Sequence, residues 1–436
     1  MKVIGIITEY NPFHNGHKYH IEEAKKITGA DYVIAVMSGN FVQRGHPAIM
    51  DKYTRSMIAL NNGVDIILEL PVCYATSSAE YFALGAVTLL DRLGIVDYIC
   101  FGSESGDIKV LEKAAKLFNN QGDDFQDYIS SYIKKGLSYP VARAKATSKV
   151  LSLDGSDSSN HDLIDAISEP NNILGIEYIK ALYKINSSMK PITINRKDAH
   201  YHDKNINYLE TKVDLPGHDL NPNYTFSSAT AIRGIIEDTD NLSGLHSIKD
   251  SVPQNVFDYF KSKYKITYPI TIKDFESIIK YKLLYEDNQE LSSYLDLSPD
   301  MADRIKHIDL INTNIQDIIE NIKTKNITLT RVNRALIHVL LNIKSDDILK
   351  FTKDDIIYYA RILGIKKEAS HLIRKIKNSE RLPIITKLSK AHEQLNPSGM
   401  KMLNQDILAA HLYNQAVYKK FKTTIPNEYK HGVYIL

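Results

Sequence analysis

The sequence predicts an α/β protein, in which an N-terminal parallel sheet with helices on both faces is followed by a basic α-helical C-terminal part. Short Val- and Ile-rich runs alternate with helical periodicity up to about residue 105, as in a doubly wound parallel sheet. From about residue 250 this alternation stops, and long helices rich in Ile, Leu, Lys and Asn dominate. With 436 residues, 43% of them hydrophobic, the chain is long enough for separate cores, and we expect domains at 1–240 and 250–436.

The N-terminal elements follow from hydrophobic periodicity. Strands, each a short apolar run, are expected at residues 2–8, 32–37, 65–70, 97–101 and 191–194. Helices are expected at residues 18–26, 51–62, 77–93 and 171–182, and further helices between 107 and 150 are expected to cover the sheet. Residues 154–160 form a small polar run that cannot bury apolar surface, which indicates a surface insertion. Ligands of such sheets bind beyond the carboxyl ends of the strands, so the candidate loops are 9–17, 38–49, 71–76 and 102–107.

The first of these loops carries the strongest chemical signal. It leads from a strand into a helix, whose N-terminal N–H groups and positive dipole end can hold a phosphate. His14 and His17 are spaced so that both imidazoles can face the same oxygen atoms at the mouth of the helix. Imidazole donors, neutral or protonated, suit a phosphate that gains charge during displacement. Pro12 stiffens the turn, and Gly16 lets the backbone approach closely.

For an arbitrary pair of histidines, an exposed loop position without a role would be the plainer interpretation. Here the segment TEYNPFHNGH at residues 8–17, directly after a strand, resembles the T-x-[FY]-[DN]-P-x-H-x-G-H stretch of the nucleotidyltransferase superfamily. These Rossmann-like enzymes cleave ATP between its α- and β-phosphates. The resemblance implies that His14 and His17 are catalytic and act on the α-phosphate.

The second loop, SGNFVQRGHP at residues 38–47, is bounded by glycines and has Gln43 and Arg44 at its tip. We interpret it as a mobile lid that carries a cation onto a phosphate, helped by Lys52 and Arg55 in the next helix. Ordinary solvated charges are the alternative. In the fourth loop, Gly102 would let a flat base or ribose lie against the backbone, or would form a plain turn.

Residues 195–203 contain Arg196, His200, His202 and Asp203. The last three could be metal ligands, but no fourth ligand lies nearby, so we prefer an ordered loop with Arg196 directed at the nucleotide and no protein-held metal. Asn171 is expected at a helix N-terminus, after Ser-Glu-Pro. The two cysteines, at positions 73 and 100, lie in or beside apolar runs without CxxC spacing, which indicates reduced core thiols.

A second motif, SSATAIRG at residues 227–234, places Ser228 and Thr230 at a helix start and Arg233 about a turn and a half later. It resembles the I-S-S-T-x-I-R element that closes the site in the same superfamily, where hydroxyls, helix N–H groups and the arginine take the β- and γ-phosphates. Ser227 replaces the leading Ile, and Ala229 replaces the second Ser. An N-capped helix without a ligand is the alternative.

The charge of the C-terminal part differs from that of the rest of the chain. Residues 321–436 contain 21 Lys and Arg against 9 Asp and Glu, a balance of +12, whereas the whole chain is +2 and residues 1–320 therefore sum to −10. Basic helices interleaved with Tyr and His suit a phosphate backbone, and a lysine-rich solvated face is the alternative. The tRNA-binding candidates are Arg331, Arg334, Arg374 and Lys375.

The whole chain resembles the bacterial tRNA(Met) cytidine acetate ligase family, through the segments above together with FGSESGD and SEPNNILG. The resemblance implies an HxGH nucleotidyltransferase domain that activates acetate with ATP, and with Mg²⁺, to acetyl-adenylate and pyrophosphate. The acetyl group then passes to the wobble cytidine of elongator tRNA(Met), giving N4-acetylcytidine. The ATP-binding residues implied are Ile7, Thr8, Glu9, Tyr10, Asn11, Pro12, Phe13, His14, Asn15, Gly16, His17, Lys18, Tyr19, His20, Gly102, Asn171, Arg196, Ser228, Thr230 and Arg233.

Two other functions compete with this one. The first motif alone would fit a small-molecule adenylyltransferase, but such an enzyme has no use for about 200 residues of basic helices. A non-catalytic RNA-binding protein that senses ATP is disfavoured because both histidines are present. No run approaches the roughly 18 apolar residues of a membrane span, and the sequence starts in a strand, so we expect a cytoplasmic enzyme without membrane contact and leave its oligomeric state open.

Overall fold

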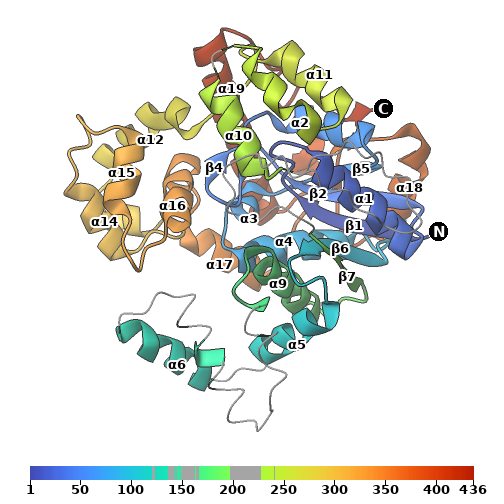
Figure 1. Cartoon of the computed structure of the whole chain (residues 1–436), viewed down its shortest axis with the longest axis horizontal. Coiled ribbons are helices and arrows are strands. Elements are labelled where there is room, and N and C mark those ends of the chain that lie inside the picture. Colours follow the sequence, from blue (N-terminus) through green and yellow to red (C-terminus); the bar gives the residue numbers. More distant parts are fainter. Residues whose placement is uncertain are drawn as a thin grey trace.

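The chain forms one central sheet whose strands come from both halves of the sequence (Figure 1). The computed structural model describes residues 1–119, 123–135, 166–196, 227–239 and 241–436, together with residues 142, 145–147, 149 and 163. The strand order is β10-β8-β5-β2-β1-β6-β7, and β9 also pairs with β8. The strands of this sheet are β1 (Val3–Thr8), β2 (Tyr32–Ser38), β5 (Ile66–Leu70), β6 (Tyr98–Ser103), β7 (Lys190–Asn195), β8 (Ala360–Ile365), β9 (Ile384–Ile385) and β10 (Tyr434–Ile435).

The N-terminal strands are parallel, as the sequence predicts. Ile4 of β1 lies opposite Val33 of β2 on one side and Tyr98 of β6 on the other. Strands β2 and β5, and strands β6 and β7, are also parallel pairs. Their carboxyl ends therefore meet at one edge of the sheet, and this edge carries the loops that contain the sequence motifs.

Helices cover both faces of the sheet because successive strand residues point to opposite sides. Val3, Ile34 and Val36 contribute to a core shared with α4 and α9, while Ile4 and Ile6 contribute to a core shared with α1, α2, α10 and α11. The helices of the N-terminal part are α1 (Asn15–Thr28), α2 (Lys52–Asn61), α3 (Val72–Ala75), α4 (Ala79–Arg92), α5 (Ile108–Asn119), α6 (Asp123–Lys134), α9 (Pro170–Lys184) and α10 (Ala229–Asp238).

The C-terminal half is mainly helical, as predicted, but it also supplies strands to the sheet. The expectation that strands stop near residue 250 is wrong for β8, β9 and β10, and β8 pairs antiparallel with β5. Short apolar runs such as β8 do not by themselves distinguish a strand from a buried helix. The helices are α11 (Gln254–Lys263), α12 (Glu276–Tyr285), α13 (Asn288–Ser292), α14 (Pro299–Lys306), α15 (Ile315–Ile322), α16 (Leu329–Leu341), α17 (Ser345–Lys353), α18 (Ser370–Asn378) and α19 (Pro397–Phe421), with short 3-10 turns η1 (Gly244–Ser251), η2 (Ile272–Phe275), η3 (Lys367–Ala369) and η4 (Leu388–Glu393).

Two local features differ from the prediction. Helix α1 begins at Asn15 rather than at residue 18, because His14 occupies the N-cap position. A small hairpin of β3 (Phe41–Val42) and β4 (His46–Pro47) follows β2, and two-residue strands are too short to show a sequence alternation.

The polar run at residues 154–160 lies outside the described residues. No helix in the described part of the chain is long and apolar enough to cross a membrane.

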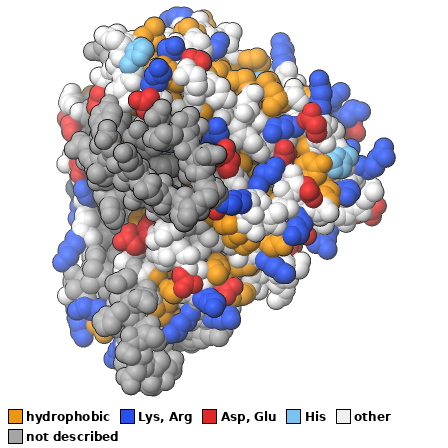
Figure 2. Space-filling view, turned by 45° about the vertical axis from the view of Figure 1, so that its right-hand side comes forward, with side chains coloured by type: hydrophobic (Ala, Val, Ile, Leu, Met, Phe, Trp, Pro, Cys, Tyr) orange, Lys and Arg blue, Asp and Glu red, His pale blue; other side chains and the backbone are white. Residues whose placement is uncertain are grey.

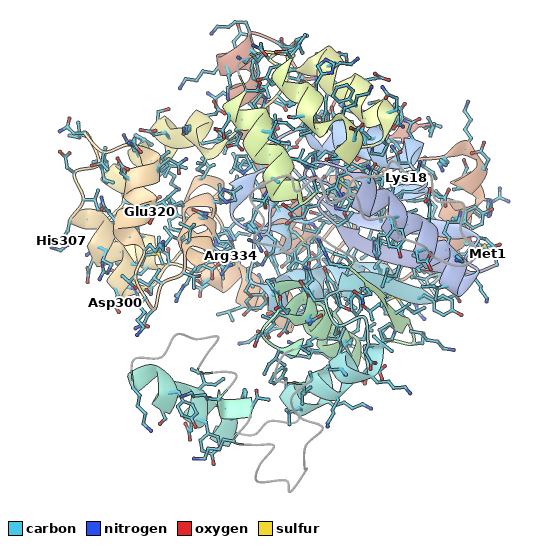
Figure 3. All side chains as sticks on the ribbon, in the orientation of Figure 1. Met1, Lys18, Asp300, His307, Glu320 and Arg334 are labelled. Atoms are coloured by element: carbon cyan, nitrogen blue, oxygen red, sulfur yellow. The ribbon has the colours of Figure 1, made fainter. Side chains whose placement is uncertain are left out.

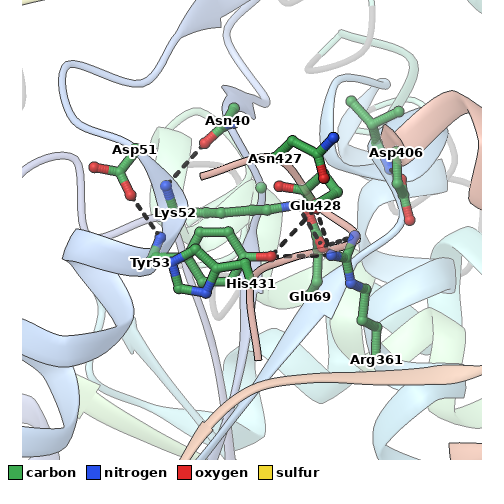
Figure 4. Close-up of polar contacts among 12 residues, drawn as sticks. Asn40, Asp51, Lys52, Tyr53, Glu69, Arg361, Asp406, Asn427, Glu428 and His431 are labelled. Carbon is green, nitrogen blue, oxygen red and sulfur yellow. Dashed lines mark hydrogen bonds and ion pairs between the residues drawn. The ribbon is translucent and has the colours of Figure 1, made fainter. Parts of the chain in front are cut away.

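A buried network of charged side chains joins the last residues of the chain to the sheet (Figure 4). Lys52 Nζ lies 2.8 Å from both Glu69 Oε1 and Glu428 Oε2, and Arg361 pairs with the same two carboxylates. Lys52 and Arg55 were expected to reach a phosphate or to be solvated, and both are buried at 1% exposure. Arg55 donates to the backbone oxygens of Glu9, Ser38 and Gly39, so both cations have structural partners.

Candidate active site

A cavity of about 620 Å³ opens at the carboxyl ends of β1 and β6, where a doubly wound sheet binds its ligand. Loops of the N-terminal part, α9, α10 and the start of α16 all contribute to its wall. The predicted residues that line it are Ile7, Thr8, Glu9, His14, Gly16, His17, Tyr19, His20, Gln43, Arg44, Gly102, Asn171, Arg196, Ser228, Thr230, Arg233 and Arg334. The two sequence motifs therefore meet in one cavity.

His14 and His17 lie at the N-terminus of α1 with their rings stacked, the centroids 3.7 Å apart and the planes 25° apart. The His14 backbone N–H donates to His17 Nδ1 at 3.2 Å. That nitrogen accepts, so a neutral His17 carries its proton on Nε2 and can donate from there. His14 Nδ1 is buried and has no hydrogen-bond partner among the described residues, which leaves this atom available to a ligand.

The imidazoles of this cluster are neutral at physiological pH. Burial, with Arg196 and Arg233 nearby, lowers the pKa of His14 to about 3. Burial and the adjacent His14 hold the pKa of His17 well below its usual range, and burial with Arg196 lowers the pKa of His20 to about 4. The sequence left open whether the imidazoles are neutral or protonated, and these shifts favour neutral donors. The positive charge of the cavity therefore comes from arginines.

Arg233 connects the second motif to the first. Its Nη1 donates to the backbone oxygen of Asn11 at 2.6 Å, and its Nη2 donates to Thr230 Oγ1 at 3.1 Å. Ser228 is the N-cap of α10, and its hydroxyl accepts from the Ala231 N–H at 3.1 Å. The hydroxyls, the helix N-terminus and the guanidinium of the second motif thus lie beside the histidine loop, as the resemblance implies.

Arg196 lies across the end of β6. Its Nη1 donates to Asn171 Oδ1 at 3.1 Å, and a side chain at Gly102 would bring a Cβ to 3.1 Å from Arg196 Cγ. Gly102 was expected to leave room for a base or ribose, but that space holds Arg196. Glu104, which the sequence did not indicate, accepts from the backbone N–H groups of Asn171 and Asn172 and so fixes the start of α9.

The β3–β4 hairpin, interpreted from the sequence as a mobile lid, forms a wall of the cavity. The Gln43 N–H donates to Glu9 Oε1 at 2.9 Å, and Gln43 Nε2 donates to the backbone oxygen of Ser77 at 3.2 Å. A Cβ at Gly45 would overlap the backbone of Asn333 and Arg334, so the hairpin lies directly on α16. Gln43 and Arg44 of the hairpin line the cavity.

Several residues of the predicted ATP-binding set do not line the cavity, and some of them hold the loop in place. Tyr10 and Phe13 are buried in the core. Asn11 Oδ1 accepts from the Ile49 N–H at 2.8 Å, and Asn15 Nδ2 donates to the backbone oxygen of Asp250 at 2.8 Å. The residues concerned are Tyr10, Asn11, Pro12, Phe13, Asn15 and Lys18. A motif in the sequence does not distinguish residues that contact a ligand from those that shape the loop around it.

The four tRNA-binding candidates fall into two places. Helices α14, α15 and α16 lie together beside the sheet (Figure 1). Arg334 is half-buried on the inner side of this group of helices, whereas Asp300 and His307 lie on its outer side (Figure 3). Arg334 Nε lies 2.7 Å from Asp296 Oδ2, and Arg331 Nε donates to the Asp296 backbone oxygen at 3.0 Å.

The other two candidates, Arg374 and Lys375, lie on α18 near the chain's N-terminus, at the opposite end of the sheet (Figure 1). On the face in Figure 2, the basic side chains are scattered among acidic and apolar ones.

Thiol and metal chemistry are not indicated by the described residues. Both cysteines are free and buried, and burial raises the pKa of each thiol, in agreement with the expected core thiols. No group of three or more His, Cys, Asp or Glu in the described ranges could hold a metal ion. His200, His202 and Asp203 lie outside those ranges.

Comparisons with known proteins show which proteins the chain resembles over its whole length. A family model described as HIGH Nucleotidyl Transferase matches residues 1–428. The tRNA(Met) cytidine acetate ligase of Halothermothrix orenii is 41% identical over 421 residues, covering 95% of this chain and 94% of that protein. The protein of the same name from Caldicellulosiruptor saccharolyticus is 38% identical, covering 100% and 99%.

Two solved structures of Thermotoga maritima TmcAL match the whole fold. The apo form superposes with a TM-score of 0.87 at 30% sequence identity, and each chain is covered fully. The form bound with alpha-thio ATP superposes with a TM-score of 0.85 at 29% identity, again with full coverage of both chains.

Proposed function

The chain belongs to the tRNA(Met) cytidine acetate ligase family, and we propose that it activates acetate with ATP and transfers the acetyl group to the wobble cytidine of elongator tRNA(Met). One observation carries the assignment of this chemistry to the cavity. Arg233 of the second motif donates a hydrogen bond to the backbone of the first motif, which supports a single ATP site formed by both motifs. A relative with the same fold binds an ATP analogue, which supports ATP as the first substrate.

In the first half-reaction, an acetate oxygen attacks the α-phosphate and pyrophosphate leaves. A carboxylate is a poor nucleophile toward an anionic nucleotide, so the protein must chiefly align the reactants and neutralise charge. We assign the α-phosphate to the N-terminus of α1, where His17 Nε2–H and His14 are the neutral donors. Arg233, with the hydroxyls of Ser228 and Thr230, would take the leaving phosphates.

Mg²⁺ would enter this cavity with ATP as part of the substrate. Glu9 is the single carboxylate among the described residues that line the cavity, and its Oε1 already accepts a hydrogen bond from Gln43. This is too few oxygen ligands for a metal held by the protein, whereas Mg²⁺ bound to substrate phosphates keeps most of its waters.

In the second half-reaction, the exocyclic amine of the cytidine attacks the acetyl carbonyl and AMP leaves. The cytosine must be unstacked from its loop to reach the cavity. We propose that it enters between the β3–β4 hairpin and the starts of α9 and α16, on the side where Gln43, Arg44 and Arg334 line the wall. The basic helices of the C-terminal half would hold the rest of the tRNA.

The test is acetate-dependent exchange of pyrophosphate into ATP. We expect the wild-type protein to catalyse it, and His14→Ala and His17→Ala each to lower kcat about 10²-fold or more while the protein stays folded. Exchange by both variants at the wild-type rate would remove the imidazoles from the mechanism. Exchange that required a phosphorylated metabolite instead of acetate would indicate a small-molecule adenylyltransferase, and no exchange with any carboxylate would indicate a non-catalytic ATP-binding protein.

A further inference from the structure

Glu9 places a negative charge in a cavity whose other charged side chains are cations. Among the described residues that line it, Glu9 is the single carboxylate, whereas Arg44, Arg196, Arg233 and Arg334 are all cations. A negative charge here repels both the triphosphate and the acetate. A role of the Glu9 carboxylate in the reaction would offset this repulsion.

The position of Glu9 is well defined. It follows the last residue of β1, and its backbone oxygen accepts from Arg55 Nη1 at 2.5 Å. Its Oε1 accepts from the Gln43 N–H at 2.9 Å, whereas Oε2 accepts no hydrogen bond from the described residues. The side chain is half-buried, with one oxygen committed to the hairpin and the other left for a ligand.

The charge of Glu9 affects three of the elements that line the cavity. Burial lowers the pKa of both Arg44 and Arg233, and in each case the Glu9 carboxylate partly opposes that effect. Burial and the Glu9 carboxylate together raise the pKa of Tyr178, on α9. Glu9 therefore acts electrostatically on the hairpin, on the second motif and on α9, which all line the cavity.

We propose that Glu9 is the general base of acetyl transfer, an inference that rests on the proposed function. As the cytidine N4 forms its bond to the acetyl carbon, the bond from that carbon to the AMP phosphate oxygen breaks. AMP leaves with the electron pair, and the N4 proton passes to Glu9 Oε2. The amide product stays neutral, and the protonated Glu9 later releases its proton to water.

The other lining groups are poor candidates for this role. Arginine does not give up a proton in proteins, so it cannot serve as a base. Among the imidazoles, His17 Nδ1 is already occupied by the His14 N–H, and His20 Nε2 lies 3.4 Å from the Cys100 thiol. His14 is assigned to the α-phosphate in the first half-reaction. Burial also raises the pKa of Tyr19 and Tyr178, which keeps these phenols protonated.

The test separates the two half-reactions in Glu9→Gln, whose amide oxygen can still accept the Gln43 N–H. We expect single-turnover acetyl transfer to tRNA to slow by about 10²–10⁴-fold. Acetate-dependent pyrophosphate exchange should be much less affected, or even raised, because the lost charge repels both the triphosphate and the acetate. Glu368→Gln, an exposed site on η3, is the matched control and should leave both rates unchanged.

Two results would overturn the proposal. Transfer by Glu9→Gln at the wild-type rate, with Glu9→Ala impaired, would show that Glu9 only holds the hairpin. Equal loss of exchange and transfer in Glu9→Gln would move its role to adenylation. Failure of the wild-type protein to exchange pyrophosphate with acetate would count against the proposed function instead.

Discussion

Replacing Glu428 by Gln should destabilise the protein far more than an ordinary surface substitution. The buried network contains two cations, Lys52 and Arg361, and two anions, Glu69 and Glu428, so it is neutral as a whole. Gln keeps the shape and most hydrogen bonds but leaves one positive charge unbalanced in the core. At 2.8 Å and an effective dielectric constant of about 20, the lost attraction between Glu428 and Lys52 is ~6 kcal/mol.

Part of that attraction is offset because a neutral amide costs less to bury than a carboxylate. Measured losses on breaking buried pairs are about 3–5 kcal/mol, and we expect Glu428→Gln to lower the free energy of unfolding by this amount. Urea unfolding followed by circular dichroism measures it, and Glu380→Gln, at an exposed position, is the control. The double variant with Lys52→Met restores neutrality and should recover part of the loss.

A loss below about 1 kcal/mol in Glu428→Gln would refute this reasoning, since it would mean that water screens the network. The pH dependence gives a second check. Lys52 and Arg361 lower the pKa of Glu428 to about 2, despite its burial, from an ordinary value of 4.5. Its contribution is therefore fully present above pH 4.5 and should be lost as the pH falls toward 2, but only in the wild-type protein.

Three further predictions concern ATP binding, the pH dependence of exchange and tRNA binding. Arg233→Ala should weaken binding of a non-hydrolysable ATP analogue by about tenfold or more, and Arg196→Ala should do so less strongly; unchanged affinity and turnover, by calorimetry and exchange, would exclude both roles. The pKa of His14 is lowered from 6.5 to about 3, so the exchange rate should not fall as the pH drops through 6.5. In the unfolded chain His14 takes up a proton near pH 6.5, so the free energy of unfolding should decline below that pH. Reversing Arg374 and Lys375 to Glu should leave exchange intact and weaken tRNA binding with a reduced salt dependence; tRNA binding as tight as wild type at every salt concentration would place the tRNA surface elsewhere.

The predictions that the structure confirms depended on patterns within short, continuous stretches of sequence. The alternation of apolar runs predicted the parallel strands. The two short motifs indicated His14, His17 and Arg233, which line one cavity, because each motif lies in one continuous stretch of chain. A motif also fixes the loop that presents it, and so Tyr10 and Phe13 were assigned to the ligand although they pack in the core. Sequence pattern alone does not separate these two uses of a residue.

The features that the sequence did not indicate are contacts between distant segments. Lys52 was assigned to the phosphates or to solvent because its partner, Glu428, is 376 residues away and no local pattern indicates the pairing. In the same way, Arg334 enters the cavity from the C-terminal half because the β3–β4 hairpin lies against α16. The strand β8 was missed because its role depends on the free edge of β5, which is formed by residues 66–70.

The position of β8 has a consequence for how the chain matures on the ribosome. The β5 edge is synthesised by residue 70, but the strand that covers it begins at Ala360, about 290 residues later. At bacterial elongation rates of about 5–20 residues per second, that edge waits roughly 15–60 s for its partner. An uncovered strand edge is a template for pairing with other chains. Nascent chains of this protein should therefore need protection by a chaperone until the ribosome has passed residue 365, and chains truncated before that point should aggregate.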